Sequence, residues 1–138
     1  MRYKISKTSE RGRLMKDCDK LHLEILKLKR GEKCEISSMP ANRLGRFHIL
    51  STATHPRLRY VDDNLLLVNW FPWHYGYHHW GLTDPRNKTI LNKIIELRGP
   101  DWHMKLLDRE KYSGHMDKLY LLALRETFKK ELKSLQGG

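Results

Sequence analysis

Hydrophobic residues recur at helical spacing in the first part of the chain. The apolar residues between positions 9 and 30 follow one another at intervals of four, three, four and three: Leu14, Cys18, Leu21, Ile25 and Leu28. This spacing predicts one face of an amphipathic helix over residues 9–30, with Gly31 as its stop. We expect Cys18 to be a buried thiol rather than a nucleophile. The basic residues fall largely off the stripe, and we interpret most of them as a solvated face: Lys16, Lys20, Lys27, Lys29 and Arg30.

Two short apolar runs predict a pair of strands in the middle of the chain. They cover residues 46–50 and 64–69, and the Pro-containing, charged segment between them predicts a long loop. Residues 31–45 are rich in Gly, Pro, Ser and Asn and predict another loop. A short helix is expected over residues 73–79.

Helical patterns return in the last third of the chain. Asp84 and Pro85 form a favourable helix start, with an N-cap acid followed by Pro at the first helical position, and Gly99 ends that helix. A turn of helix is expected over residues 101–107. We expect Ser113 to cap a final helix whose core side carries Leu121, Leu124, Phe128, Leu132 and Leu135.

These elements predict an α+β protein with a single domain, a length of 138 residues being enough for one core. The expected parts are a basic arm (1–8), a long helix (9–30), a hairpin-containing centre (46–80) and a helical C-terminal part (84–135).

The charge of the chain points to an anionic partner. Lys and Arg number 27 against 16 Asp and Glu, which gives a formal net charge of +11. Nucleic acid is the commonest partner of such a chain, an acidic membrane surface is a less common one, and a merely soluble basic protein is the plain alternative. No run approaches the roughly 20 apolar residues of a membrane span, and two cysteines cannot build a disulfide framework. We expect a cytoplasmic protein with reduced thiols and no membrane partner.

Histidines mark the centre as a candidate site. His74 and His78 are four residues apart, so on a helix they share a face and can meet at one metal ion, with His79 as a competing ligand. Paired histidines also occur where they only pack or contact solvent. His48 lies in an apolar strand, where a lone His is more often a core residue, but Asn64 opens the next strand. A His on one strand, an Asn leading the next and ligands on a following helix make up the ββα-metal, or HNH, nuclease arrangement.

The chemistry of phosphodiester cleavage explains these residue types. A divalent metal ion, Mg²⁺ or Mn²⁺ in the first instance and Zn²⁺ as an alternative, would neutralise charge on the phosphate and the leaving oxygen. His48 would take a proton from the attacking water. The Asn64 amide can donate and accept hydrogen bonds, so it could tie the loop between the strands and hold the His ring.

A closer resemblance lies in the run HILSTATHPRLRYVDDN, residues 48–64. It resembles the core of the phage NinG recombination proteins, and HYGYH, residues 74–78, is similar to a later segment of that family after a shift of about one residue. The basic flanking helices agree in kind, so the resemblance covers about residues 10–135. It implies a metal-dependent DNA endonuclease of phage recombination acting on branched or structured DNA, with His48 and Asn64 as catalytic residues and His74 and His78 as metal ligands.

The chain departs from the HNH pattern at its zinc knuckle. Two Cys-x-x-Cys pairs are usual, but CEIS (34–37) and NWFP (69–72) stand in their places, so three of four thiols are missing. We expect no structural zinc, with Trp70, Phe71 and Trp73 filling that space instead. Phe47 also stands where many HNH enzymes have a metal ligand. Both departures favour the alternative, a non-catalytic nucleic-acid-binding module derived from an HNH fold.

Arginines around the loop are candidate contacts to double-stranded or branched DNA: Arg43, Arg46, Arg57 and Arg59. For Arg59, a structural ion pair with Asp62 or Asp63 is an equal alternative. Lysines of the last helix could extend the surface. A symmetric DNA junction would call for two active sites, so a homodimer is a further expectation.

Overall fold

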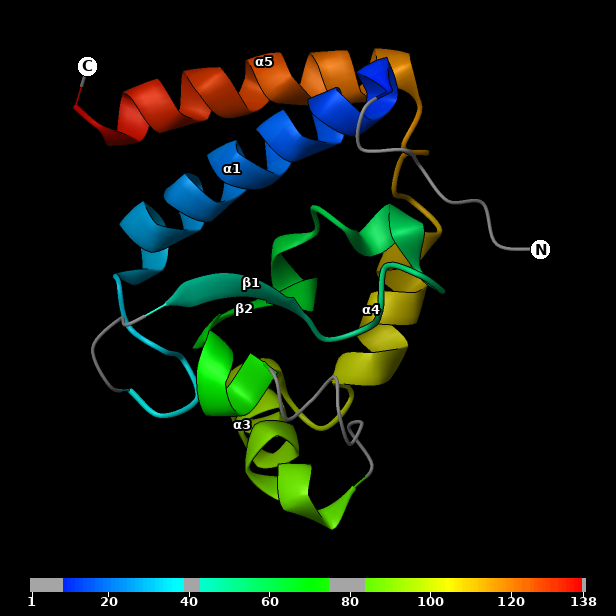
Figure 1. Cartoon of the computed structure of the whole chain (residues 1–138). Coiled ribbons are helices and arrows are strands. Elements are labelled where there is room, and N and C mark those ends of the chain that lie inside the picture. The colour runs from blue at the N-terminus through cyan, green and yellow to red at the C-terminus, as the bar shows by residue number, and fades with distance from the viewer. Residues whose placement is uncertain (1–8, 39–42, 75–83, 138) are drawn as a thin grey trace.

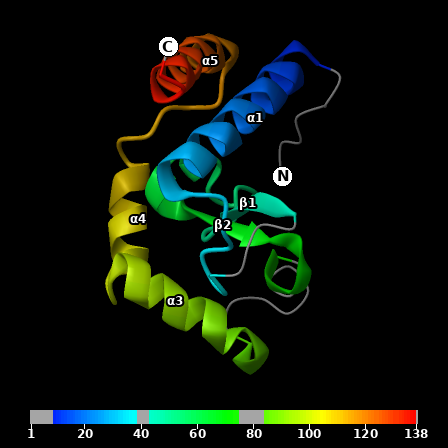
Figure 2. The same ribbon diagram turned by 90° about the vertical axis from the view of Figure 1, so that its left-hand side faces the viewer.

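The computed structural model describes residues 9–38, 43–74 and 84–137. Over these residues the fold is α+β, as predicted, and consists of four α-helices and one two-stranded antiparallel sheet. The elements are α1 (Glu10–Arg30), β1 (Leu44–His48), β2 (Leu65–Asn69), α3 (Lys88–Arg98), α4 (Trp102–Glu110) and α5 (Lys118–Leu135). Figures 1 and 2 show α1 and α5 on one side of the hairpin and α3 on the other, with α4 beside the hairpin between α5 and α3. No helix in the described ranges is long and apolar enough to cross a membrane.

The first predicted helix is confirmed at both ends. The Ser9 hydroxyl accepts a hydrogen bond from the Gly12 N–H (3.0 Å), and Gly31 ends α1 with φ of +88°. The buried face is broader than predicted, because α1 packs against both α5 and the hairpin. His22 and Leu26 are therefore buried, whereas Leu28 is half exposed.

The hairpin presents two different faces. Its register runs from Leu44 opposite Asn69 to His48 opposite Leu65. Since side chains alternate along a strand, one face packs on α3 and α4 through a cluster that includes Phe47, Leu66, Val68, Ile90, Ile94 and Leu106. The other face carries His48 and Leu65 and packs against Leu26 of α1.

Helices α1 and α5 run in the same direction and share a second apolar cluster. Ion pairs follow the same order along both helices, from Glu10 with Lys118 to Asp17 with Arg125. Cys18 is fully buried between them, and burial raises the pKa of its thiol to about 11. The expectation of a buried thiol is thus confirmed.

Several predicted boundaries are wrong. Strand β1 begins at Leu44 instead of residue 46, and α3 begins at Lys88, after a 3₁₀ turn at Pro85–Asn87, instead of at Asp84 and Pro85. A π-helical turn, Trp70–His74, follows β2 directly, where a helix from residue 73 to 79 was expected; residues 75–79 lie outside the described ranges. Helix α4 extends to Glu110. Asp117, rather than Ser113, caps α5 by accepting from the Tyr120 N–H at 2.8 Å.

Candidate functional site

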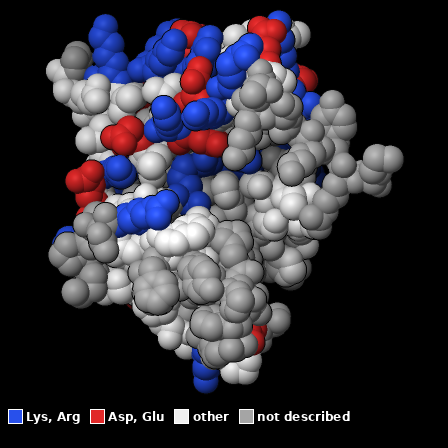
Figure 3. All heavy atoms as spheres, viewed as in Figure 1, with Lys and Arg blue, Asp and Glu red and all other residues white. Residues whose placement is uncertain are grey.

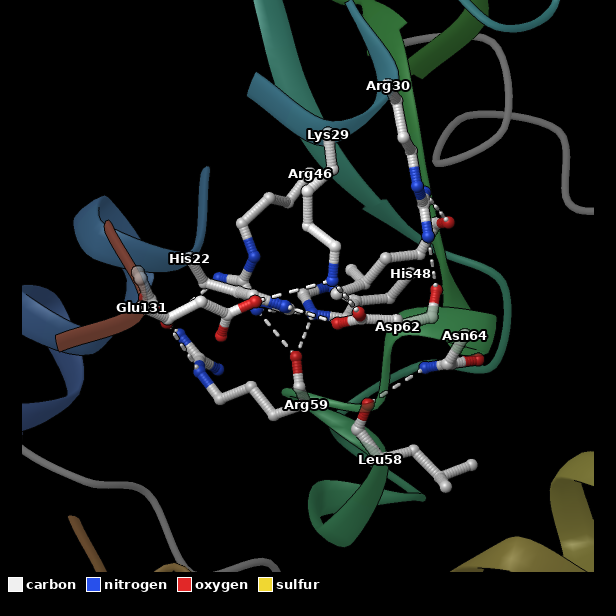
Figure 4. Close-up of polar contacts among 12 residues, drawn as sticks. His22, Lys29, Arg30, Arg46, His48, Leu58, Arg59, Asp62, Asn64 and Glu131 are labelled. Carbon is white, nitrogen blue, oxygen red and sulfur yellow. Dashed lines mark hydrogen bonds and ion pairs between the residues drawn. The ribbon is translucent and has the colours of Figure 1, made fainter. Parts of the chain in front are cut away.

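Asn64 ties together the loop between the two strands. Its buried side chain accepts from the Leu50 N–H (2.8 Å) and donates to the carbonyls of Leu50 (3.1 Å) and Leu58 (3.3 Å). Figure 4 shows the contact with Leu58. The side chain thus satisfies backbone groups that a buried loop would otherwise leave without partners, as expected from the sequence.

His48, the last residue of β1, turns toward the α1 side of the hairpin. Its Nε2 lies 3.1 Å from the carbonyl oxygen of Arg59. A carbonyl only accepts, so Nε2 carries the proton and Nδ1 is the acceptor of a neutral ring. Burial, followed by the nearby Arg46 guanidinium, lowers the His48 pKa to about 3. The Arg59 carbonyl, rather than Asn64, therefore orients this ring, and the ring is a weak base.

Asp19 of α1 is the common hydrogen-bond acceptor for three polar side chains on this face of the hairpin. It accepts hydrogen bonds from Arg46 Nη1 (2.9 Å), from Arg59 Nε and Nη2 (3.0 and 2.6 Å) and from the Tyr60 hydroxyl (2.8 Å). Burial alone would raise the Asp19 pKa, but the hydrogen bonds and charges of the two arginines outweigh it, so the pKa lies below its usual value. Asp19 is thus an ionised centre between helix and hairpin.

Two of the arginines predicted to contact phosphate, Arg46 and Arg59, instead donate hydrogen bonds within this network. The Arg46 side chain is 7% exposed and also donates to the Arg59 carbonyl. Arg59 forms the structural ion pair that was its alternative interpretation, although with Asp19 instead of Asp62 or Asp63. The sequence offered one weak signal for Asp19, an acid beside the apolar stripe of α1.

His22 is a buried polar residue that the sequence interpretation missed. Its Nε2 lies 2.8 Å from an Asp62 carboxylate oxygen, and its ring stacks on Phe128 with centroids 5.0 Å apart. The hydrogen bond from His22 lowers the Asp62 pKa to about 2, whereas burial lowers the His22 pKa. Lys29 joins Asp62 to Glu131 of α5 (Figure 4). These hydrogen bonds and ion pairs link α1 and α5 to the loop between the two strands.

His74 lies on the opposite face of the hairpin from His48. Its ring contacts the rings of Phe47 (centroids 5.8 Å apart) and Trp70 (4.7 Å). The structure therefore does not bring His48 and His74 together. His78 and His79 lie outside the described residues. Within the described ranges, no three His, Cys, Asp or Glu side chains form a group that could hold a metal ion.

The two segments compared with a zinc knuckle do lie side by side. Burial raises the pKa of Cys34, but hydrogen bonds from the Ser37 side chain and from backbone N–H groups, including that of Asn69, outweigh it and leave the pKa below its usual value. Trp73 packs partly against the neighbouring core. Trp70 is 39% exposed, so it does not provide the buried packing that was expected of it in place of the zinc. The Phe71 side chain lies outside the described part of the structure.

The other two predicted arginines reach the surface. The Arg43 guanidinium lies 5.6 Å from the centre of the Trp70 ring, and its backbone N–H donates to Asn69 Oδ1 (3.3 Å). Arg57 Nη2 lies 2.6 Å from His115 Nε2. Both side chains can contact an anion in solution without disrupting the Asp19 network.

The solvent side of α1 carries a row of cations, here called the α1 basic face: Arg13, Lys16, Lys20 and Lys27. Lys16 and Lys20 are exposed and make no ion pair with any part of the chain that the structure describes. Glu24 pairs with Lys27 at 3.4 Å. Figure 3 shows Lys and Arg gathered, with interspersed acids, over α1 and α5. Lys16 and Lys20, interpreted from sequence as merely solvated, are thus exposed cations without an ion-pair partner among the described residues.

Comparison of the chain with protein-family models, with curated proteins and with solved structures found no match. Its function therefore has to be inferred from the chemistry of its own residues.

Proposed function

We propose that this protein binds nucleic acid, DNA in the first instance, through the α1 basic face and holds it without hydrolysis. The observation that carries the proposal is a pair of exposed lysines, Lys16 and Lys20, that form no ion pair with the described parts of a chain whose net charge is +11. Lysines four residues apart on a helix lie on one side, so a phosphate backbone can meet both. Each contact releases counterions, which makes such binding strong at low salt.

The hairpin geometry supports a binding role over a catalytic one. One ring nitrogen of His48, Nε2, is hydrogen-bonded to the Arg59 carbonyl. The low pKa of His48 makes the other ring nitrogen, Nδ1, a poor proton acceptor at neutral pH. His74 belongs to the other side of the hairpin. In this proposal, the histidines and Asn64 keep an HNH-like hairpin and loop in shape, and the helices meet the nucleic acid.

Metal-dependent hydrolysis of the HNH type, with the NinG-like role in phage recombination, is the second candidate. One observation favours it: a loop fixed by Asn64 and a His48 tautomer fixed by a backbone carbonyl leave Nδ1 as the acceptor, as a general base requires. For hydrolysis by this mechanism, His74 and His78 would have to bind Mg²⁺ or Mn²⁺. His48 and His74, which lie on opposite faces of the hairpin, would also have to act on the same phosphodiester.

One experiment separates the two candidates. Purified protein is incubated with labelled duplex, single-stranded and branched DNA, with Mg²⁺ or Mn²⁺ and then with EDTA. Salt-sensitive binding without cutting is expected. Metal-dependent cutting that His48→Gln abolishes would establish the nuclease instead, and absence of binding to every DNA at low salt would refute both.

A further inference from the structure

A cleft of about 420 Å³ runs along α4, between the end of α3 and the segment that follows α4. We call it the α4 groove; the polar and aromatic residues that line it include Asp63, Arg98, Trp102, Lys105, Arg109 and Tyr112. Its size falls in the range of natural ligand sites, about 300–1,000 Å³. Helix α4 lies beside the hairpin and α3 lies on its far side from α1 (Figures 1 and 2), and the groove lining contains no residue of α1, so the groove is separate from the α1 basic face.

Aromatic rings mark the two ends of the α4 groove. Trp102 begins α4 and is half-buried against the core, whereas Tyr112 follows the helix and is 79% exposed. An exposed tyrosine ring in a cleft offers a stacking surface that packing does not use. The rings are ten positions apart, about 15 Å by the helical rise. They can therefore serve two different flat groups of one extended ligand.

Three cationic side chains line the groove together with the rings: Arg98, Lys105 and Arg109. Arg98 is held in the wall because its Nε and Nη2 donate to the carbonyls of Asp63 (3.2 Å) and Leu65 (3.1 Å). Arg109 donates to the Ser113 hydroxyl at 3.0 Å. Lys105 pairs with Asp101 at 3.3 Å, but both side chains are more than half exposed, so water or a ligand can replace that pair at little cost.

The groove thus combines two aromatic rings with cationic side chains, and its acids, Asp63 and Asp108, can accept hydrogen bonds from amino groups. A ligand that matches has flat rings at intervals, negative charges between them and amino groups at their edges. Unpaired nucleotides have this combination, and a base in a duplex has no free face to offer.

We propose that the α4 groove binds unpaired nucleotides of a nucleic-acid strand, with bases on Trp102 and Tyr112 and phosphates on Arg98, Lys105 and Arg109. This inference deepens the proposed function and rests on it, because it assigns the single-stranded part of the same ligand to a second surface. A protein that holds duplex on α1 and a free strand on α4 would favour DNA with a junction or a single-stranded tail.

The test measures fluorescence anisotropy of a labelled oligothymidine and a labelled duplex of equal length. Tyr112→Ala is expected to weaken oligothymidine binding about fivefold or more, the lower end of the loss of one aromatic–base stack. Duplex binding should change less than about twofold. Tyr112→Phe keeps the ring and should bind like the unaltered protein. Met104→Ala is the matched control, since Met104 lies on the same helix, is 75% exposed and does not line the groove.

Unchanged oligothymidine binding in both Tyr112→Ala and Arg109→Ala would overturn the inference, and so would equal losses on duplex and single strand. Competition by polyglutamate as strong as that by unlabelled oligothymidine would show that the groove takes acidic peptide instead. If the Tyr112 variants change nothing while Lys16→Glu/Lys20→Glu abolishes duplex binding, the inference about the groove fails and the proposed function stands. If the unaltered protein binds neither DNA, both fail.

Discussion

At the scale of single residues, one carboxylate organises the interface between α1 and the hairpin. Asp19 faces two guanidinium groups and a tyrosine hydroxyl, and the Arg46 side chain among them is almost completely buried. Breaking a buried ion pair leaves an uncompensated charge away from water, which costs more than the pair itself contributes.

Replacing Asp19 by Asn should therefore lower the free energy of unfolding by about 3 kcal/mol, because Arg46 and Arg59 lose their shared counter-charge. Urea denaturation at neutral pH measures the change. Asp17→Asn is the matched control: the same exchange on the same helix removes an exposed pair with Arg125, and should cost less than about 1 kcal/mol. Equal losses in the two variants would show that the Asp19 network contributes no more than a surface pair.

Residue roles were predictable where the chemistry is local. The side-chain amide of an Asn that precedes a strand can form hydrogen bonds with the backbone of a neighbouring loop, and Asn64 does so. The roles of Arg46 and Arg59 depended on which side of the hairpin faces Asp19, a residue from 27 to 40 positions away. No pattern within the loop carries that information.

At the scale of elements, α1 and the hairpin enclose neutral histidines. The folded-state pKa values of His48 and His22 both lie below the ordinary value of 6.5, and that of His48 falls to about 3. Below pH 6.5 the unfolded chain binds protons that the folded chain does not, so unfolding becomes more favourable as the pH falls.

Stability should hence decline as the pH is lowered from about 7 to 5. His48 alone contributes a loss of about 2 kcal/mol at pH 5, since each pH unit below the unfolded pKa is worth about 1.4 kcal/mol. Asp62, with a pKa near 2, is ionised throughout this window. Urea midpoints at several pH values provide the measurement, and His48→Gln should flatten the profile. A profile unchanged by that exchange would mean that His48 is protonated as readily in the folded as in the unfolded protein.

The two chain segments that contain Cys34 and Asn69 lie side by side and allow a direct test of the HNH resemblance. If these segments have the geometry of a knuckle that lost its thiols, Ser37→Cys, Asn69→Cys and Pro72→Cys together should restore a tight zinc site beside Cys34. Zinc analysis after dialysis should find one metal per chain, and zinc should raise the melting temperature. Moving one thiol, with Ser38→Cys in place of Ser37→Cys, provides the control. Failure of the triple variant to retain zinc would contradict the knuckle interpretation.

Element ends were predictable where capping residues act locally. Ser9 and Gly31 mark the ends of α1, and Gly99 follows the last residue of α3. The start of α5 was placed four residues too early, because Asp117 competes with Ser113 as a cap and the Gly114 backbone packs against the Tyr120 ring. The buried arc of α1 was also misjudged, since contact with two partners widens it beyond a single stripe.

At the scale of the whole molecule, the fold carries two separate surfaces. The α1 basic face lies on α1, whereas the α4 groove lies along α4, beside the hairpin, and shares no residue with α1. The net charge leads us to expect an anionic partner, and the α+β class could be predicted from periodicity. Which cations stay unpaired could not, because Lys29 and Arg30 find acids from α5 and the loop, whereas Lys16 and Lys20 find none in the described parts of the chain.

The most direct test of the account compares two charge-reversed proteins in duplex DNA binding. Lys16→Glu/Lys20→Glu alters the α1 basic face, and Lys130→Glu/Lys133→Glu makes the same change on the exposed side of α5. Both lower the formal net charge from +11 to +7, since each exchange removes two units. The α1 variant is expected to lose roughly tenfold or more in affinity, and its log–log salt dependence should become shallower by about two. The α5 variant should keep most of its affinity. Equal losses in both variants would show that net charge alone drives binding and would contradict a defined nucleic-acid surface on α1.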